Sequence, residues 1–105
     1  MKIIYNNIIP FKGFAAINLF GILFVRKGVR VTERMINHET IHTAQIREML
    51  YIFFYLWYIT EWFVKLFFYG LKAYRNISFE REAYKNDNDR NYLSERKHYS
   101  WIRWL

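Results

Sequence analysis

Asn37-His38-Glu39-Thr40-Ile41-His42 lies inside a run from Val29 to Tyr69 that contains no glycine or proline. On an α-helix His38 and His42 stand one turn apart on the same face, where two imidazoles can bind one Zn²⁺. Glu39 lies about 100° round the helix from His38, so it can take a proton from a metal-bound water without filling a ligand position. The pattern therefore predicts a helix that carries a metal site. The alternative is a helix with two surface histidines beside an exposed glutamate.

Length and composition limit the kind of protein that this chain can form. With 105 residues, 53% of them hydrophobic, residues 1–105 can build a single domain with a real core. The chain has no cysteine, which excludes a disulfide framework, a thiolate metal site and a cysteine nucleophile. A metal site must therefore use His and carboxylate ligands, for which zinc is the first candidate.

Charge and hydropathy bear on location and partners. The formal net charge of +7 is compatible with nucleic acid, an anionic membrane surface or simple solubility. The tail, residues 91–105, is basic and aromatic, but Asp87, Asp89 and Glu95 dilute that patch, so we expect no nucleic-acid partner. The first residues contain only a short apolar piece, so we predict no signal peptide and a cytoplasmic location.

Residues 1–31 predict strands. Lys2 to Ile9 is a short apolar piece that fits a strand or an extended arm. Residues 11–25 are almost entirely apolar and are broken at Gly13 and Gly21. Two strands, or one bulged strand, fit this pattern.

Residues 32–69 predict helix. Thr32 is a good N-cap, and Glu33 follows in the first turn, where a negative charge suits the helix dipole. One helix over this whole range would be about 57 Å long at 1.5 Å per residue, too long for a domain of this size. We therefore expect a break or kink between Gln45 and Phe54.

The apolar segment 49–71 allows three interpretations. Few polar residues interrupt it, and about 20 apolar residues can cross a bilayer. However, Glu61 and Lys65 stand well inside the segment, where a charge at mid-bilayer depth is costly, and its tyrosines and tryptophans prefer an interface. We give most weight to a buried helix that closes a small core, less to an interfacial helix, and least to a true membrane span.

Residues 78–90 predict a further helix. Ser78 is placed to N-cap it, with Glu80 and Glu82 in its first turns. The stretch Asn86-Asp87-Asn88-Asp89 fits a loop or a fraying helix end. Early strands followed by helices predict an α+β fold, with a small antiparallel sheet packed on two or three helices.

A catalytic zinc needs three protein ligands and one open position. The downstream candidates for the third ligand are Glu48, Glu61, Glu80, Glu82, Asp87, Asp89, Glu95 and His98. Glu48 lies too close to the histidines on their own helix to reach the metal, and Glu61 has Lys65 as its simplest partner. Glu80 and Glu82 stand two apart, about 200° round a helix, so only one of them can face the metal. The alternative for Glu80 is an ordinary first-turn acid that stabilises a helix start.

His38-Glu39-x-x-His42 together with the later Glu80-x-x-Ala83-Tyr84 resembles the gluzincin metallopeptidases. Similar in size are the minigluzincins, small soluble scaffolds related to the catalytic domains of integral-membrane metallopeptidases. The resemblance implies that Glu80 is the third ligand and that Ala83 lets the two helices approach closely. Tyr84 departs from the family pattern, because an acidic or amide residue that orients the histidines is usual there.

The resemblance also implies a mechanism, a zinc-dependent hydrolysis of peptide bonds. In it, Glu39 takes a proton from the metal-bound water as that water attacks a peptide carbonyl, and passes the proton to the leaving amine. A donor for the oxyanion is needed as well. The weak candidates for it, each more typical of packing or surface positions, are Tyr84, Tyr92 and His98.

Three further expectations concern substrate, regulation and the rival function. The family places an edge strand over the cleft, against which an extended substrate pairs, and the matching stretch is Ala15 to Phe20 or Ile22 to Arg26. The tail at Trp101–Leu105 either folds over the cleft and holds the enzyme latent, as in the small relatives, or packs on the core. The rival is a membrane-associated protein with a structural or vestigial metal site, contacting a membrane surface through 49–71.

Overall fold

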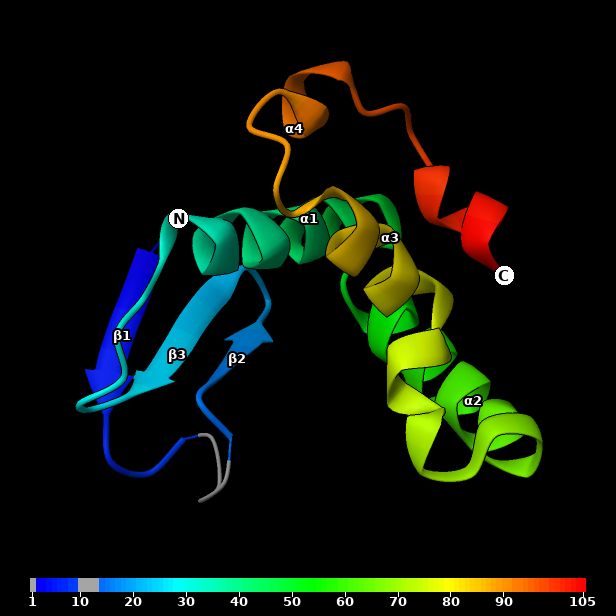
Figure 1. Ribbon diagram of the computed structural model, residues 1–105, viewed down its shortest axis with the longest axis horizontal. Coiled ribbons are helices and arrows are strands. Elements are labelled where there is room, and N and C mark those ends of the chain that lie inside the picture. Colours follow the sequence, from blue (N-terminus) through cyan, green and yellow to red (C-terminus); the bar gives the residue numbers. More distant parts are fainter. Residues whose placement is uncertain (1, 10–13) are drawn as a thin grey trace.

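The computed structural model describes residues 2–9 and 14–105, and it confirms the predicted α+β class. A small sheet lies at one end of α1, and the remaining helices surround the other end (Figure 1). The strands and α-helices are β1 (Lys2–Asn6), β2 (Ala16–Leu19), β3 (Ile22–Arg26), α1 (Glu33–Glu48), α2 (Ile52–Tyr69), α3 (Ser78–Asn86) and α4 (Tyr92–Glu95). Short 3₁₀ helices are η1 (Gly70–Lys72), η2 (Tyr74–Asn76) and η3 (Ser100–Trp104). The predicted break at Gly13 lies outside the described residues.

The sheet is mixed, with strand order β1-β3-β2. β2 and β3 are antiparallel, but β1 runs parallel to β3, so the prediction of an antiparallel sheet is wrong for β1. β2 and β3 form a hairpin through Phe20 and Gly21, whose φ angles of 54° and 91° suit a tight two-residue turn. The link from β1 to β2 is longer, so β1 can reach the opposite side of β3 and pair there in parallel.

The sheet packs on α1 beside the histidine motif. Leu23 and Val25 alternate along β3 and are fully buried, as expected for the covered face of a sheet. The Asn18 side chain on β2 donates to the backbone oxygen of Glu39 at 2.9 Å and to Thr43 Oγ1 at 3.0 Å. These two bonds fix β2 against the middle of α1.

α1 begins and ends close to where the sequence predicts. Thr32 is the N-cap, and its side chain accepts a hydrogen bond from the Met35 amide at 3.1 Å. After Glu48 the helix stops, because Leu50 and Tyr51 adopt positive φ angles of 55° and 63°. The chain bends by 111° at this point, so the expected break before Phe54 is confirmed.

α2 is far more exposed than predicted. Only Phe54 and Glu61 among its residues are buried, so the interpretation that we favoured, a buried helix closing the core, is wrong. One side of α2 contacts α1, η1 and η2, and also α3 and η3 through the rings of Phe79 and Trp101, and the rest of its surface is exposed. No described helix on its own is long and apolar enough to cross a membrane; α1 and α2 taken together meet that length and composition, but across the 111° bend.

The start of α3 is stabilised by a glutamate of α2 and not by a side-chain cap from Ser78. Ile77 occupies the N-cap position, so the prediction that Ser78 caps the helix is wrong. Glu61 on α2 accepts hydrogen bonds from the Ser78 amide at 2.5 Å and the Ser78 hydroxyl at 2.6 Å. Lys65, the predicted partner of Glu61, pairs with it at 2.8 Å. A carboxylate at this helix start favourably meets the positive end of the dipole.

The hydrophobic core lies where α1, α2, α3 and η3 meet. Its buried members are Ile46, Phe54, Ile77, Phe79 and Trp101. The Trp101 ring lies 4.6 Å from the ring of Phe79 and 5.6 Å from that of Trp57. The aromatic tail therefore packs on the core, which is the second of the two expectations for it.

Candidate metal centre

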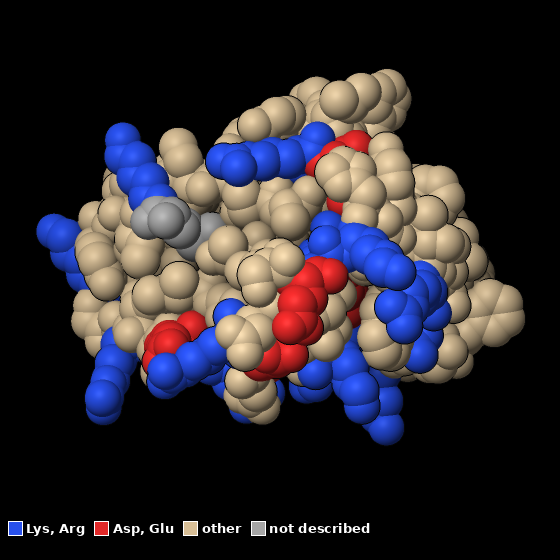
Figure 2. All heavy atoms as spheres, turned by 90° about the horizontal axis from the view of Figure 1, so that it is seen from above, with Lys and Arg blue, Asp and Glu red and all other residues tan. Residues whose placement is uncertain are grey.

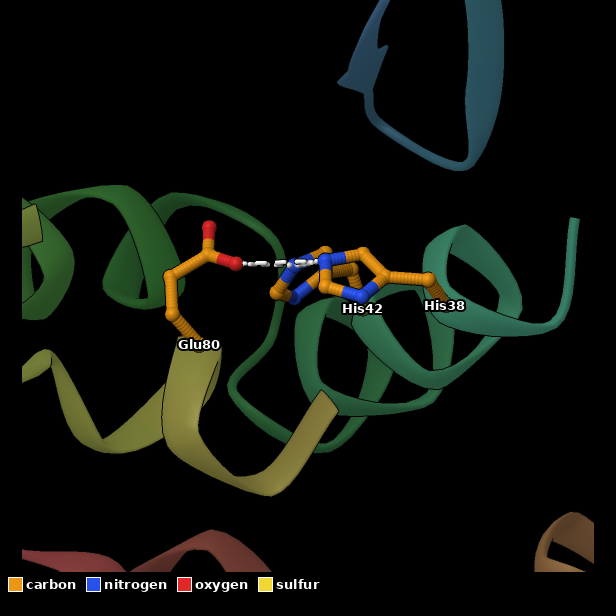
Figure 3. A group of neighbouring side chains, drawn as sticks. All are labelled: His38, His42 and Glu80. Atoms are coloured by element: carbon orange, nitrogen blue, oxygen red, sulfur yellow. Dashed lines mark hydrogen bonds and ion pairs between the residues drawn. The ribbon is translucent and has the colours of Figure 1, made fainter. Parts of the chain in front are cut away.

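Three ligand atoms from α1 and α3 meet in a small triangle. His38 Nε2 lies 3.2 Å from His42 Nε2, and Glu80 Oε1 lies 3.2 Å from the first and 3.1 Å from the second. Figure 3 shows the carboxylate from α3 pointing at the two imidazoles of α1. The structure thus brings together the three residues that the sequence analysis selected as ligands.

The size of the triangle suits one metal ion. Ligands bound at about 2.0–2.1 Å in tetrahedral geometry stand about 3.3 Å apart, close to the three separations observed here. His42 and Glu80 are buried and His38 is nearly so, which keeps competing water away from these atoms. The cluster of His38, His42 and Glu80 could therefore bind a metal ion.

The ring orientation of His38 is set by Asp87. His38 Nδ1 lies 3.0 Å from Asp87 Oδ2, and since a carboxylate only accepts, Nδ1 carries the proton and donates. Asp87 also accepts from Arg34 Nε at 2.8 Å. From the sequence, Asp87 was expected in a loop or a fraying helix end and was one of the candidates for the third ligand, so its contact with His38 was not predicted. A spacing of seven residues from Glu80 puts Asp87 on the same helix face two turns on, which is a signal that could have revealed it.

The ring orientation of His42 is set by Gln45. Gln45 Nε2 donates to the Phe79 carbonyl at 3.0 Å and to Glu82 Oε1 at 2.9 Å. Its oxygen therefore faces His42 and accepts from Nδ1 at 2.8 Å. With Nδ1 of both histidines donating outward, each Nε2 faces the centre of the triangle, and a metal bound there would take the lone pairs of both Nε2 atoms in the tautomer that it requires.

Glu80 is held through its second oxygen. The Tyr58 hydroxyl on α2 donates to Glu80 Oε2 at 2.7 Å, which leaves Oε1 to face the histidines. Burial, and then the Glu80 carboxylate, raise the pKa of Tyr58, so the hydroxyl stays protonated and remains a donor. Sequence analysis missed Tyr58, because in an apolar run a tyrosine is indistinguishable from its packing neighbours.

The cluster requires a positive charge at its centre. Two nitrogen lone pairs and a carboxylate oxygen within hydrogen-bonding distance repel one another unless a proton or a metal lies between them. Burial opposes the charging of His42, but the nearby Glu80 carboxylate outweighs it and raises the pKa of His42 to about 10. Burial also opposes the charging of Glu80, which by itself would raise its pKa. The neighbouring His42 and His38 outweigh burial and hold the pKa of Glu80 well below its usual range.

Glu39 stands beside the ligands without joining them. It follows His38 on α1, and the three ligands all act on its charge. Burial raises the pKa of Glu39, while His42 and His38 oppose that rise. A half-buried carboxylate in this position suits a proton acceptor.

Glu82 and Glu48 are occupied elsewhere. Arg96, from the segment after α4, contacts Glu82 at 2.5 Å and Glu48 at 2.7 Å, and all three side chains are buried. The Tyr92 hydroxyl also donates to Glu82, at 2.6 Å. The choice between Glu80 and Glu82 as a ligand therefore goes to Glu80, and Tyr92 does not lie at the metal site.

The remaining predicted residues divide between the site and the surface. The Tyr84 ring lies 4.5 Å from the His38 ring and packs under Arg75, so Tyr84 is the one oxyanion candidate beside the ligands. His98 is exposed and contacts only the Tyr99 ring among its described ring partners. Asp89 accepts from a nearby backbone amide and Glu95 is exposed.

The two candidate edge strands are now distinguished. β3 is central, so Ile22 to Arg26 cannot be an edge. β2 is an outer strand of the sheet and is bonded through Asn18 to the backbone of Glu39. It therefore places a strand edge next to the metal cluster.

Comparisons of this chain with protein-family models, with curated proteins and with solved structures found no match.

Proposed function

We propose that this protein is a zinc metallopeptidase of the gluzincin type. The observation that carries the proposal is the triangle of His38, His42 and Glu80, with both Nε2 lone pairs directed inward by Asp87 and Gln45. Ionisable groups that came together by chance would not be expected to show both the spacing of a tetrahedral metal site and a separate hydrogen-bond acceptor behind each imidazole.

Zinc is the metal that this ligand set favours. Two imidazole nitrogens and one carboxylate oxygen form the set typical of catalytic zinc in peptidases, and three protein ligands leave a fourth position open. Harder ions such as Mg²⁺ and Ca²⁺ prefer sites made of oxygen atoms alone. A bound zinc ion supplies a Lewis acid and an activated water at neutral pH.

The protein's own residues supply proton transfer and positioning. Glu39, which is not a ligand, is placed to take a proton from a water at the site and return it to the leaving amine. Tyr58 donates to Glu80 Oε2 and so leaves Oε1 as the oxygen that would hold the metal. Tyr84, beside His38, is the candidate donor to the oxyanion of the substrate.

The edge of β2 is the candidate substrate-binding strand. Within residues 2–9 and 14–105, no strand pairs with its outer side, where the Tyr55 hydroxyl contacts the Asn18 carbonyl and the Phe20 amide and leaves the Ala16 end open. A peptide in extended form can add to such an edge through main-chain hydrogen bonds. Because Asn18 fixes β2 to the backbone at Glu39, a peptide bound there lies near the proposed proton acceptor.

A comparison of Glu39→Gln with Glu33→Gln tests this function. Both substitutions remove one carboxylate charge from α1, but Glu33 is exposed and pairs only with the exposed Arg90 among its described ion pairs. With zinc-loaded full-length protein and a mixture of extended peptides, we expect Glu39→Gln to bind zinc normally and to lower the cleavage rate by ~100-fold or more. We expect Glu33→Gln to cleave like the wild type.

Two outcomes would contradict the proposal in different ways. Equal cleavage by Glu39→Gln and the wild type means that Glu39 is not the proton acceptor. A wild-type protein that holds zinc at His38, His42 and Glu80 but cleaves none of the peptides indicates a structural metal site, as in the rival function.

A further inference from the structure

The outer surface of α2 is apolar nearly everywhere. Phe67 and Phe68 are 78% and 77% exposed, and Leu71 just beyond the helix is fully exposed. With 3.6 residues per turn, the exposed positions of α2 cover about two-thirds of its circumference. A water-soluble monomer rarely exposes a continuous apolar surface of this extent.

The two charges of α2 both point away from this surface. Glu61 and Lys65 pair with each other on the covered side, where Glu61 binds Ser78 and Lys65 donates to the Asn76 carbonyl. The exposed polar side chain of Thr60 donates to the Leu56 carbonyl one turn before it. The two charges that argued against a membrane span in the sequence are therefore satisfied inside the protein.

A basic groove begins where α2 ends. It encloses about 600 Å³ and is lined by Lys72, Arg75, Arg81 and Lys85, together with uncharged residues and no acid. Arg75 is held over the Tyr84 ring at 3.8 Å. Lys72 directly follows the exposed Leu71, so the groove adjoins the apolar surface.

We propose that the outer surface of α2 and this basic groove together bind the surface of an anionic lipid bilayer. Lipid suits the apolar surface, because a bilayer can surround two-thirds of a helix, whereas a second copy of the chain would cover one side of it. Anionic headgroups suit the groove, because each cation near such a surface is attracted to it. In the view of Figure 2, Lys and Arg side chains cover more of the surface than acidic ones, chiefly at the left, along the lower edge and right of the centre, in keeping with the net charge of +7.

Flotation of the full-length protein with vesicles tests this proposal. One vesicle type contains phosphatidylcholine alone, and the other contains equal parts of phosphatidylcholine and phosphatidylglycerol. We expect the wild type to bind the anionic vesicles at least ~10-fold more strongly than the neutral ones, and added salt to reduce the difference.

Two double variants separate the apolar and the charged contributions. Phe63→Ser with Phe67→Ser changes only exposed positions of α2 and should abolish binding to both vesicle types. Lys72→Glu with Lys85→Glu should remove the preference for anionic vesicles. Circular dichroism should show that both variants remain folded.

Matched controls come from the sheet end of the molecule. Ile8→Ser removes an equally exposed apolar residue, and Lys27→Glu reverses an exposed charge; both should bind vesicles like the wild type. Binding that ignores lipid charge, or that survives the two serines, overturns the proposal. Failure of the wild type to bind vesicles also overturns the proposal. If that protein sediments as a dimer and the two serine substitutions dissociate it, the apolar surface of α2 binds a second copy of the chain instead of lipid.

Discussion

Asp87 and Gln45 set the ring orientation and the tautomer of the two histidines in the candidate metal centre. Each lies behind one histidine and accepts a hydrogen bond from its Nδ1–H group, so that Nε2 is the nitrogen left to face a metal. Neither residue would bind the ion itself. Such outer contacts fix both ring orientation and tautomer, and their loss weakens metal binding even when every ligand remains.

Asp87→Ala should weaken zinc binding without removing a ligand. His38 would lose the acceptor at its Nδ1, so its ring could rotate and change tautomer, and we expect the zinc dissociation constant to rise by ~10–100-fold. Isothermal titration with zinc measures it. Asp89→Ala is the control, because the exposed side chain of this neighbour accepts only from a local backbone amide among its described contacts. Similar affinities for the two variants would contradict the role given to Asp87.

Zinc affinity should rise with pH. The pKa of His42 is raised from 6.5 to about 10 in the metal-free cluster, so His42 carries a proton through the neutral range. A metal must displace that proton, so we expect affinity to rise by ~10-fold per unit between about pH 6 and pH 8. The stability of the metal-free fold should change in the opposite direction. The stabilisation from protonated His42 beside the Glu80 carboxylate is complete below about pH 6.5 and is lost as the pH rises through about 10. An affinity that is constant over this range would contradict a protonated His42.

At the scale of elements, Glu61 joins α2 to α3. It accepts two hydrogen bonds from Ser78 at the start of α3 and pairs with Lys65, and it is almost fully buried. Glu80 follows Ser78 by two residues, so this contact also helps to position the third ligand. Sequence analysis found the Glu61–Lys65 pair from its spacing, but it could not show that the pair replaces the predicted serine cap.

Glu61→Leu should be strongly destabilising. It leaves the Lys65 ammonium without its carboxylate partner in a nearly buried position, and we expect the free energy of unfolding to fall by ~3–5 kcal/mol. Glu33→Leu also removes an ion pair, but an exposed one, so its loss should stay below ~1 kcal/mol. Urea denaturation of the two variants compares these values. Equal losses would show that Glu61 is no more important than a surface acid.

Helix boundaries were easier to predict than helix environment. Thr32 has a side chain that satisfies free amides at a helix start, and chain length alone required a break before Phe54, so both could be predicted from local chemistry. The exposure of α2 could not, because hydropathy does not reveal which neighbours are available to cover a helix. Strand direction was missed for a similar reason, since the position of β1 depends on the path of the link to β2.

At the scale of the whole molecule, three elements converge on the proposed zinc. α1 supplies His38 and His42, α3 supplies Glu80, and α2 supplies Tyr58 behind it. The ligands could be selected from the sequence because their spacing is a direct consequence of helix geometry. The residues that support them depend on tertiary packing: the spacing of Asp87 from Glu80 was a usable sign in the sequence, but nothing in the apolar run distinguished Tyr58 from its neighbours.

The tail belongs to the same assembly. Arg96 joins Glu48 on α1 to Glu82 on α3, and Gln45 links Glu82 to His42. A continuous chain of hydrogen bonds therefore runs from the tail to the candidate ligand His42. Trp101 lies in the core, so the described contacts of the tail support the fold and do not cover the ligands.

Zinc content of the full-length protein tests the central claim most directly. After removal of metal and reloading with zinc, mass spectrometry of the metal should find one ion per wild-type chain and almost none in His38→Ala or Glu80→Ala. His98→Ala, which removes the exposed third histidine, should retain the full amount. A wild type without zinc, or a His38→Ala variant that keeps as much zinc as the wild type, would contradict the metal site and the peptidase proposal that rests on it.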